Sequence, residues 1–304
     1  MSLILVPVWL LLQVQPGNDM EPVHAGNQVY VDALRSGFHA DGATIRFPGP
    51  ILKDGLDANQ QHAALLKLSG SERALADLLR DSVTAPFLLK VRDQKMTDAT
   101  VRIVDLWFVV RGDLARLDPV EVASQASGKA VEAGNMRFAS RLLTDDELKP
   151  RGRSSHRGRD LDLSRWFVHL EGRLLDRIAV EATNEAVATR TEESMVIAGR
   201  TDPVFDSDPT LANRWRTLGQ DGQAGSGHPF RGGLSYAKIS RLKQPPGSLL
   251  VEFHGAFSEP EAWFQGAPIL RSKFGPIAQD QIRRLRRELL KNEPNSAPPG
   301  ANAR

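Results

Sequence analysis

The sequence contains no cysteine. This absence excludes disulfide bonds, a cysteine nucleophile, cysteine-ligated zinc and iron–sulfur clusters. The sequence also has little excess charge of either sign, because 39 basic and 37 acidic residues give a formal net charge of +2. Nucleic-acid-binding domains are usually strongly basic, and only 2 tyrosines and 12 phenylalanines are present for stacking on bases. We therefore predict no nucleic-acid partner.

Motifs that would identify a reaction are missing as well. Residues 128–130 contain a Gly-Lys pair but lack the Ser or Thr that follows the lysine of a phosphate-binding loop. Residues 233–237 resemble the nucleophile turn of serine hydrolases, but a strand is expected after them where that turn requires a helix. We predict no cofactor.

The chain begins with an apolar run at residues 3–14. At about a dozen residues this run is too short to cross a bilayer, which takes roughly 20. It fits the apolar core of a secretory signal, and residues 23–25 offer small side chains before a cut. We therefore predict a signal peptide at residues 1–25 and export to the periplasm or cell envelope. If the segment is retained as a buried first strand, the protein is cytoplasmic.

Residues 26–291 are predicted to form one α+β domain, followed by a disordered tail at residues 292–304. Polar, Arg-rich residues 144–162 and Gly-rich residues 220–233 predict two long loops. Apolar alternation predicts strands at residues 29–34, 43–47, 87–91, 100–110, 166–174, 178–189, 194–199, 234–242 and 248–257. Capping residues and apolar periodicity predict helices at residues 57–67, after Ser69, near Asp118 and at residues 276–291.

The last predicted helix is amphipathic. Ile282, Leu285 and Leu289 lie on one face with Ala278, because they are separated by three or four residues. Basic side chains occupy the other faces: Arg283, Arg284, Arg286, Arg287 and Lys291. We expect the apolar face to pack on the sheet. An anionic membrane surface is an alternative partner for the basic side.

Early strands, two short helices, a series of antiparallel strands and a long C-terminal helix follow one another in the order of the helix-grip fold. In that fold a curved antiparallel sheet wraps the last helix and leaves an apolar pocket beneath it. The analogy rests on architecture alone. We predict this helix-grip-like α+β fold, with Ile282, Leu285 and Leu289 as candidate pocket residues. The alternative is an open antiparallel sheet with helices on one face.

Two acidic groupings are the candidates for chemistry. Glu252 and His254 share one face of a predicted strand, where the carboxylate could orient the imidazole for acid–base catalysis. The opposite face is more apolar, so we expect this pair to face solvent. Asp202, Asp206 and Asp208 could share a cation. We favour a turn in which these side chains bind backbone amides, and we predict no metal.

These observations leave three hypotheses for the function. The first is a non-catalytic, exported protein that binds a lipid or other apolar small molecule under the C-terminal helix. The second is an envelope-associated structural or interaction protein without a small ligand, with a filled core and an apolar surface patch. The third is a hydrolytic enzyme that uses the acidic groupings above, which would then converge in a cleft.

Overall fold

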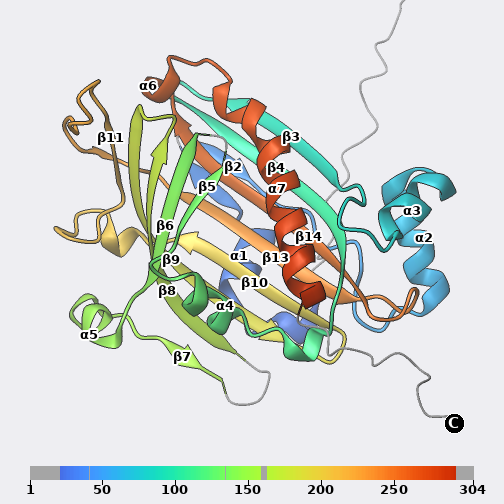
Figure 1. Ribbon diagram of the computed structural model, residues 1–304. Helices are drawn as coiled ribbons and strands as arrows, with labels where there is room; N and C mark the ends of the chain where they lie inside the picture. The colour runs from blue at the N-terminus through green and yellow to red at the C-terminus, as the bar shows by residue number, and fades with distance from the viewer. Residues whose placement is uncertain (1–20, 41, 134, 159–162, 292–304) are drawn as a thin grey trace, which may run out of the picture.

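The computed structural model describes residues 21–40, 42–133, 135–158 and 163–291. The signal peptide predicted for residues 1–25 lies mostly outside these residues, and the tail predicted for residues 292–304 lies wholly outside them. Within the described part, a 12-stranded sheet, a two-stranded sheet and seven α-helices form a mixed α+β fold (Figure 1).

All strand pairs are antiparallel. The small sheet contains β1 (Phe38–Ala40) and β2 (Ala43–Ile45). The large sheet contains β3 (Leu88–Lys95), β4 (Ala99–Arg111), β5 (Ala130–Ala133), β6 (Met136–Leu142), β7 (His156–Arg157), β8 (Ser164–Leu174), β9 (Ile178–Arg190), β10 (Ser194–Thr201), β11 (Arg214–Thr217), β12 (His228–Pro229), β13 (Gly233–Arg241) and β14 (Ser248–Pro260). Its main order is β3-β4-β14-β13-β10-β9-β8-β6-β5, so β3 and β5 are its ends and the sheet does not close.

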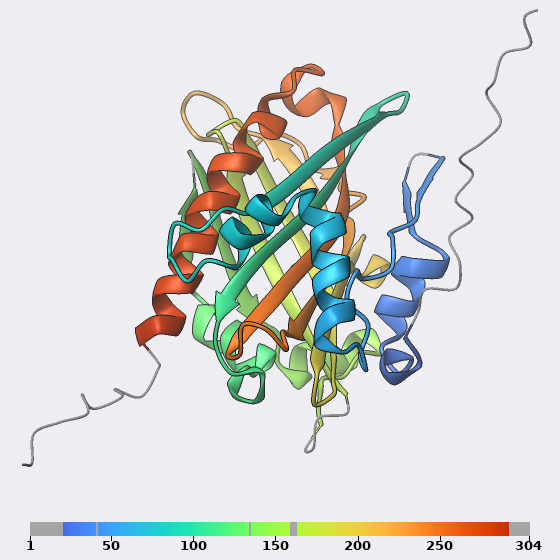
Figure 2. The ribbon, with the colours of Figure 1, turned by 90° about the vertical axis from the view of Figure 1, so that its right-hand side faces the viewer.

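The helices fall between and after these strands. They are α1 (Gln28–Arg35), α2 (Ala58–Ser69), α3 (Glu72–Leu79), α4 (Pro119–Ala126), α5 (Asp145–Leu148), α6 (Glu261–Phe264) and α7 (Ile269–Lys291). Four short 3₁₀ turns in the described residues are η1 (Pro22–His24), η2 (Leu114–Arg116), η3 (Lys149–Arg151) and η4 (Pro203–Phe205). Helices α1 and α7 lie on opposite faces of the large sheet (Figure 2).

The predicted α+β architecture is confirmed: two short helices follow the first strands, and a long C-terminal helix packs on a large antiparallel sheet. Several elements also form where their local signals predicted them. The carboxylate of Asp57 accepts from the backbone N–H of Gln60 at 2.9 Å, and the Gln60 side chain accepts from the Asp57 N–H at 3.0 Å. This capping box starts α2. Pro119 begins α4 after Asp118, whose carboxylate caps its first amides.

The strand predicted at residues 29–34 is wrong, because these residues form α1. Asn27 caps this helix by accepting from the backbone N–H of Tyr30 at 3.1 Å. Tyr30 and Ala33, which are fully buried, then pack on the sheet. Burial of one helical face therefore overrides the strand propensity of the β-branched and aromatic residues in this segment.

Helix α7 begins two turns earlier than predicted, at Ile269 instead of Pro276. Proline was interpreted as the first helical residue, whereas here it lies inside the helix. The added turns are held by apolar burial: Leu270 packs in a cluster with Trp263 and Phe264 from α6.

Both predicted loops contain short elements. Residues 144–162 include α5, η3 and the short strand β7, and residues 159–162 lie outside the described part. Residues 220–233 contain β12, and β13 begins at Gly233. The strands β5, β6 and β11 were not predicted.

Residues 21–25 are part of the folded domain. Glu21 and His24 are buried, and both bind side chains from the large sheet. A cut after Ala25 would remove these two side chains from the interior. Residues 21–25 thus pack with the domain that was predicted to begin at residue 26, and the boundary itself stays a prediction.

Candidate functional site

The register of the strands divides their side chains between two faces. On β10, Met195 and Ile197 point toward the side of α7, and Val196 and Ala198 point toward α1. The cross-strand pairs carry this alternation through β9, β13, β14 and β4. We call the two sides the α7 face and the α1 face.

The α7 face is apolar but only half-buried at its centre. The half-buried apolar side chains on this face come from six adjacent strands and are Val104, Leu106, Val168, Leu170, Ala186, Ile197, Ala237, Ile239, Val251 and Phe253. Helix α7 contacts mainly β3 and β4, at one edge of the sheet. Figure 1 shows it crossing this side of the sheet while β8 and β6 lie away from it. The face therefore presents an apolar surface that one helix covers only in part.

A cavity of about 330 Å³ adjoins this surface at the end where β9 finishes. Its sheet side includes Ala188, Arg190 and Met195, and its other wall includes Ala115 and Leu117 from the η2 segment. A second cavity of about 460 Å³ shares Ala115 and Arg190 with the first. Small-molecule sites commonly occupy roughly 300–1,000 Å³, and both cavities fall within this range. Their linings are mixed and include several charged side chains, so they form a polar end of the α7 face.

The α7 helix places the three predicted pocket residues differently. Ile282 is buried and packs with Phe108 and Leu249 of the sheet. Leu289 packs on the same cluster and is half-buried, whereas Leu285 is 36% exposed. Ile282 therefore anchors the helix, and whether Leu285 and Leu289 contact a ligand stays a prediction.

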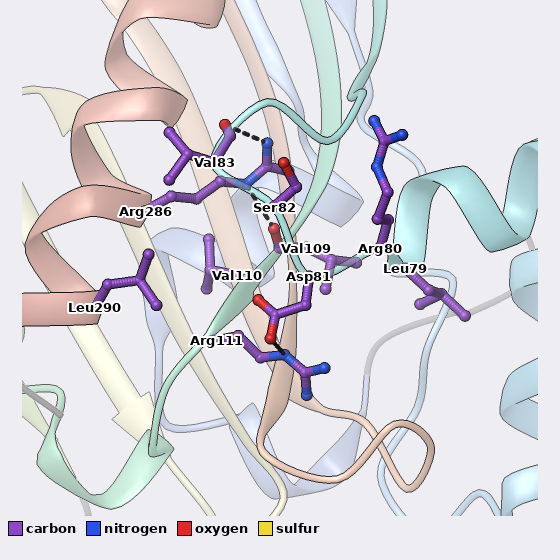
Figure 3. Close-up of a pocket in the computed structure, with 10 residues that line it drawn as sticks. All are labelled: Leu79, Arg80, Asp81, Ser82, Val83, Val109, Val110, Arg111, Arg286 and Leu290. Carbon is purple, nitrogen blue, oxygen red and sulfur yellow. Dashed lines mark hydrogen bonds and ion pairs between the residues drawn. The ribbon is translucent and has the colours of Figure 1, made fainter. Parts of the chain in front are cut away.

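A buried arginine holds α7 on the sheet. Arg286, predicted to lie on the basic outer side, is only 5% exposed. Its guanidinium donates to the backbone carbonyls of Val109, at 3.0 Å, and Val83, at 3.2 Å (Figure 3). It also donates to the carbonyl of Ala85, at 2.6 Å. The space beside it measures about 20 Å³, close to what one water needs. Burial lowers the pKa of Arg286. The outer basic side therefore keeps Arg283, Arg284 and Arg287, and its attraction to an anionic membrane stays a prediction.

The α1 face has the opposite character, because it buries charged groups. The ammonium of Lys238 is fully buried and pairs with Glu21 and with Asp54, the latter at 3.1 Å. Ser194 donates to Asp54 at 2.6 Å and lies 2.8 Å from Nε2 of His24. We call these five residues the lysine network.

Glu21, His24 and Asp54 place their ligand atoms close enough together for a metal ion. Lys238 already supplies the positive charge to both carboxylates. Burial and the nearby ammonium of Lys238 lower the pKa of His24 to about 4, although Asp54 opposes the shift. His24 is therefore a neutral hydrogen-bonding group at neutral pH, and the arrangement is an internal ion cluster.

A second polar network on the α1 face contains one of the predicted catalytic pairs. His254 Nδ1 lies 2.7 Å from Asp105, and its Nε2 lies 2.9 Å from Glu252. Glu252 also accepts from the Trp107 indole N–H at 2.9 Å and from the Ile51 backbone N–H at 2.9 Å. Burial favours neutral imidazole, but the two carboxylates outweigh it and raise the pKa of His254.

The expectation that Glu252 and His254 face solvent is wrong, since they are 2% and 0% exposed. The sequence showed the more apolar face of β14 correctly, but residues 46–55 and α1 cover the other face, where Ile51 reaches Glu252. Both ring nitrogens of His254 are occupied by carboxylates. The pair therefore contributes to the buried interior, and neither residue lines the cavities of about 20, 330 and 460 Å³ in the described part of the chain.

The three predicted cation ligands have separate partners. Asp202 pairs with Arg153 at 2.6 Å, and Asp208 pairs with Arg151 at 2.5 Å. Asp206 accepts from the side-chain amide of Asn213 at 2.7 Å. Asp202 and Asp208 also accept backbone N–H groups of the local turns. The arrangement matches the turn that we favoured over a shared cation.

No family model and no curated protein matches the sequence. Among solved structures, the human STARD10 structure is similar with a TM-score of 0.36 and 8% identity, over 80% of this chain and 86% of that chain. The human StarD13 lipid transfer and protein localization domain is similar with a TM-score of 0.33 and 8% identity, over 66% of this chain and 89% of that chain. TM-scores this low do not establish a common fold. None of the described helices is long and apolar enough to cross a membrane.

Proposed function

We propose that the protein binds a lipid or another apolar small molecule on the α7 face. The observation that carries this proposal is the half-burial of ten apolar side chains across six strands, beside cavities of about 330 and 460 Å³. Apolar surface left in water costs roughly 25 cal/mol per Å², so a ligand that covers it gains binding free energy. The titratable groups with candidate catalytic roles lie on the other side of the sheet.

The experiment is native mass spectrometry of gently purified protein, with a variant that places a large side chain on the α7 face. Ala237 is half-buried at the centre of the α7 face, so Ala237→Trp should occupy ligand space. Ala139 is also half-buried, but it lies on the other side of β6, and Ala139→Trp is the matched control. We expect co-purified apolar mass with the parent and Ala139→Trp, and its loss with Ala237→Trp.

The opposite result would be a parent protein that is free of ligand and takes up none from lipid extracts. That outcome would favour an interaction protein whose partner covers the α7 face. Equal loads on the parent and a folded Ala237→Trp variant would also contradict binding at this face. Circular dichroism and thermal melting of both tryptophan variants separate lost binding from lost folding.

A further inference from the structure

Arg190 is a cation at the polar end of the α7 face, where β9 finishes. It is the last residue of β9, and the register pairs it with Met195 on β10, on the α7 face. It lines both cavities at this end of the sheet. Next to it on the same face lie Ala188 and then Ala186, which lead into the half-buried apolar surface.

The guanidinium of Arg190 makes few hydrogen bonds within the described residues. Within the described residues it donates one hydrogen bond, to the carbonyl of Ala115 at 3.3 Å, and no carboxylate lies within ion-pair distance. An arginine carries five N–H donors, so most of its donors have no protein acceptor in the described part of the chain. Burial lowers the pKa of Arg190, as expected for a cation that is partly removed from water.

Most of the nearby acidic groups in the described residues are engaged elsewhere, and Glu192, which also lines the second cavity, is exposed to solvent. The carboxylate of Asp118 pairs with Arg157 and caps α4 by accepting from two backbone N–H groups. Asp113 lies 3.5 Å from Arg241. In the second cavity, Glu193 pairs with Lys243 at 2.6 Å. Asp113 and Asp118 attract the charge of Arg190 without forming an ion pair with it, and this attraction partly opposes the effect of burial on its pKa.

We propose that Arg190 binds the anionic head of a single-chain amphiphile of the fatty-acid class, whose chain lies along the α7 face. A planar guanidinium matches a carboxylate with two parallel hydrogen bonds. The chain then runs from Ala188, which is buried, past Ile197 toward Ile239, and it covers the half-buried side chains of these two isoleucines. This inference rests on the proposed function, because it names the ligand class for the same α7 face.

Calorimetric titration of delipidated protein with dodecanoate and with dodecanol tests the inference. The two probes have the same chain and differ in the charge of the head. We expect dodecanoate to bind the parent about tenfold more tightly, which corresponds to about 1.4 kcal/mol. Arg190→Gln should remove this preference and leave dodecanol binding unchanged. Arg137→Gln removes an exposed arginine from the other side of β6 and should behave as the parent does.

The outcomes separate the two proposals. If both probes bind the parent equally, or if Arg190→Gln keeps the preference for dodecanoate, the role of Arg190 is overturned. The α7 face then remains a binding site. If neither probe binds, the proposed function falls. If acetate binds as tightly as dodecanoate, Arg190 is a simple anion site, and the proposal that it binds an amphiphile is overturned.

Two further measurements protect the test against misfolding of Arg190→Gln. Arg190→Lys keeps the charge but loses the planar fork, so it should retain part of the preference for dodecanoate. Lowering the pH through the pKa of the fatty acid neutralises the head without any substitution. The parent should then bind dodecanoic acid and dodecanol equally, and a preference that survives protonation would contradict the ion pair.

Discussion

The α1 face and the α7 face belong to the same strands, yet they bury opposite kinds of side chain. The α1 face encloses Lys238 and His254 together with their carboxylate partners. On the α7 face, Ile197 and Val251 are only half-buried. Globular proteins normally bury apolar side chains and expose charged ones. The α1 face is therefore a closed interior, whereas the α7 face leaves apolar side chains half-buried, as the proposed binding of an apolar ligand requires.

The α1 face is stabilised by specific polar contacts, whereas the centre of the α7 face is mainly apolar. A buried charge is costly unless it is paired and hydrogen-bonded, and each charge of the lysine network has such a partner. Substitutions on the α1 face should therefore reduce stability, and substitutions at the centre of the α7 face should mainly reduce binding.

The largest effect is expected for Lys238→Met. This change leaves Glu21 and Asp54 buried without their common counter-charge. Breaking a buried ion pair by removing one partner typically costs about 3–5 kcal/mol, and we expect the free energy of unfolding in denaturant to fall by that amount. Lys129→Met, at an exposed lysine after α4, is the control and should change it little. A loss no larger than that of the control would show that the network contributes no net stability.

The next effect concerns the pH dependence of stability, which should differ between the buried histidines His24 and His254. The folded pKa of His24 is lowered to about 4, below its unfolded value of 6.5, so the unfolded state binds more protons between these values. The free energy of unfolding should therefore fall as the pH drops through this window, by about 3 kcal/mol at the rate of 1.36 kcal/mol per pKa unit. His24→Gln should flatten this part of the stability curve.

His254→Gln is the comparison for that experiment. The folded pKa of His254 is raised, so its contribution is complete below the unfolded pKa and is lost as the pH rises through the folded pKa. His254→Gln should consequently leave the acid window of His24 unchanged. Urea unfolding across a pH series measures both curves. A parent stability that does not change between about pH 6.5 and 4 would contradict the assignment of His24.

Local signals in the sequence predicted much of the fold. The capping box of Asp57 and Gln60 marked the start of α2, and residues 234–242 and 248–257 predicted the β13–β14 hairpin. The apolar spacing around Ile282 predicted the packed side of α7 in part, because Ile282 and Leu289 pack on the sheet whereas Leu285 is exposed and Arg286 is buried. These features depend on residues that are close in the sequence, which is why spacing alone revealed them.

The polar interior could not be predicted in the same way. Lys238 meets Glu21, which is 217 positions away in the sequence, and His254 meets Asp105, 149 positions away. Each strand taken alone showed an apolar side and a polar side. For β14 the apolar side does pack in the core, but the expectation that the polar side faces solvent failed, because that side is buried as well. Alternation of Tyr236, Lys238 and Ser240 on one side of β13 was the available signal, but only the fold shows what covers it.

The smallest effect on the free energy of unfolding is expected at two adjacent residues, which lie on opposite faces of the sheet. Val196 is fully buried on the α1 face, and Ile197 is half-buried on the α7 face. Val196→Ala should lower the free energy of unfolding of ligand-free protein by about 2 kcal/mol, from two lost carbon groups and the cavity left behind. Ile197→Ala removes more carbon but should cost less than about 1 kcal/mol, because its surroundings are open. With ligand in excess the order should shift, since weakened binding removes the stabilisation that a ligand adds. Equal losses without ligand would mean that the α7 face is as closed as the α1 face, and the contrast between them would fail.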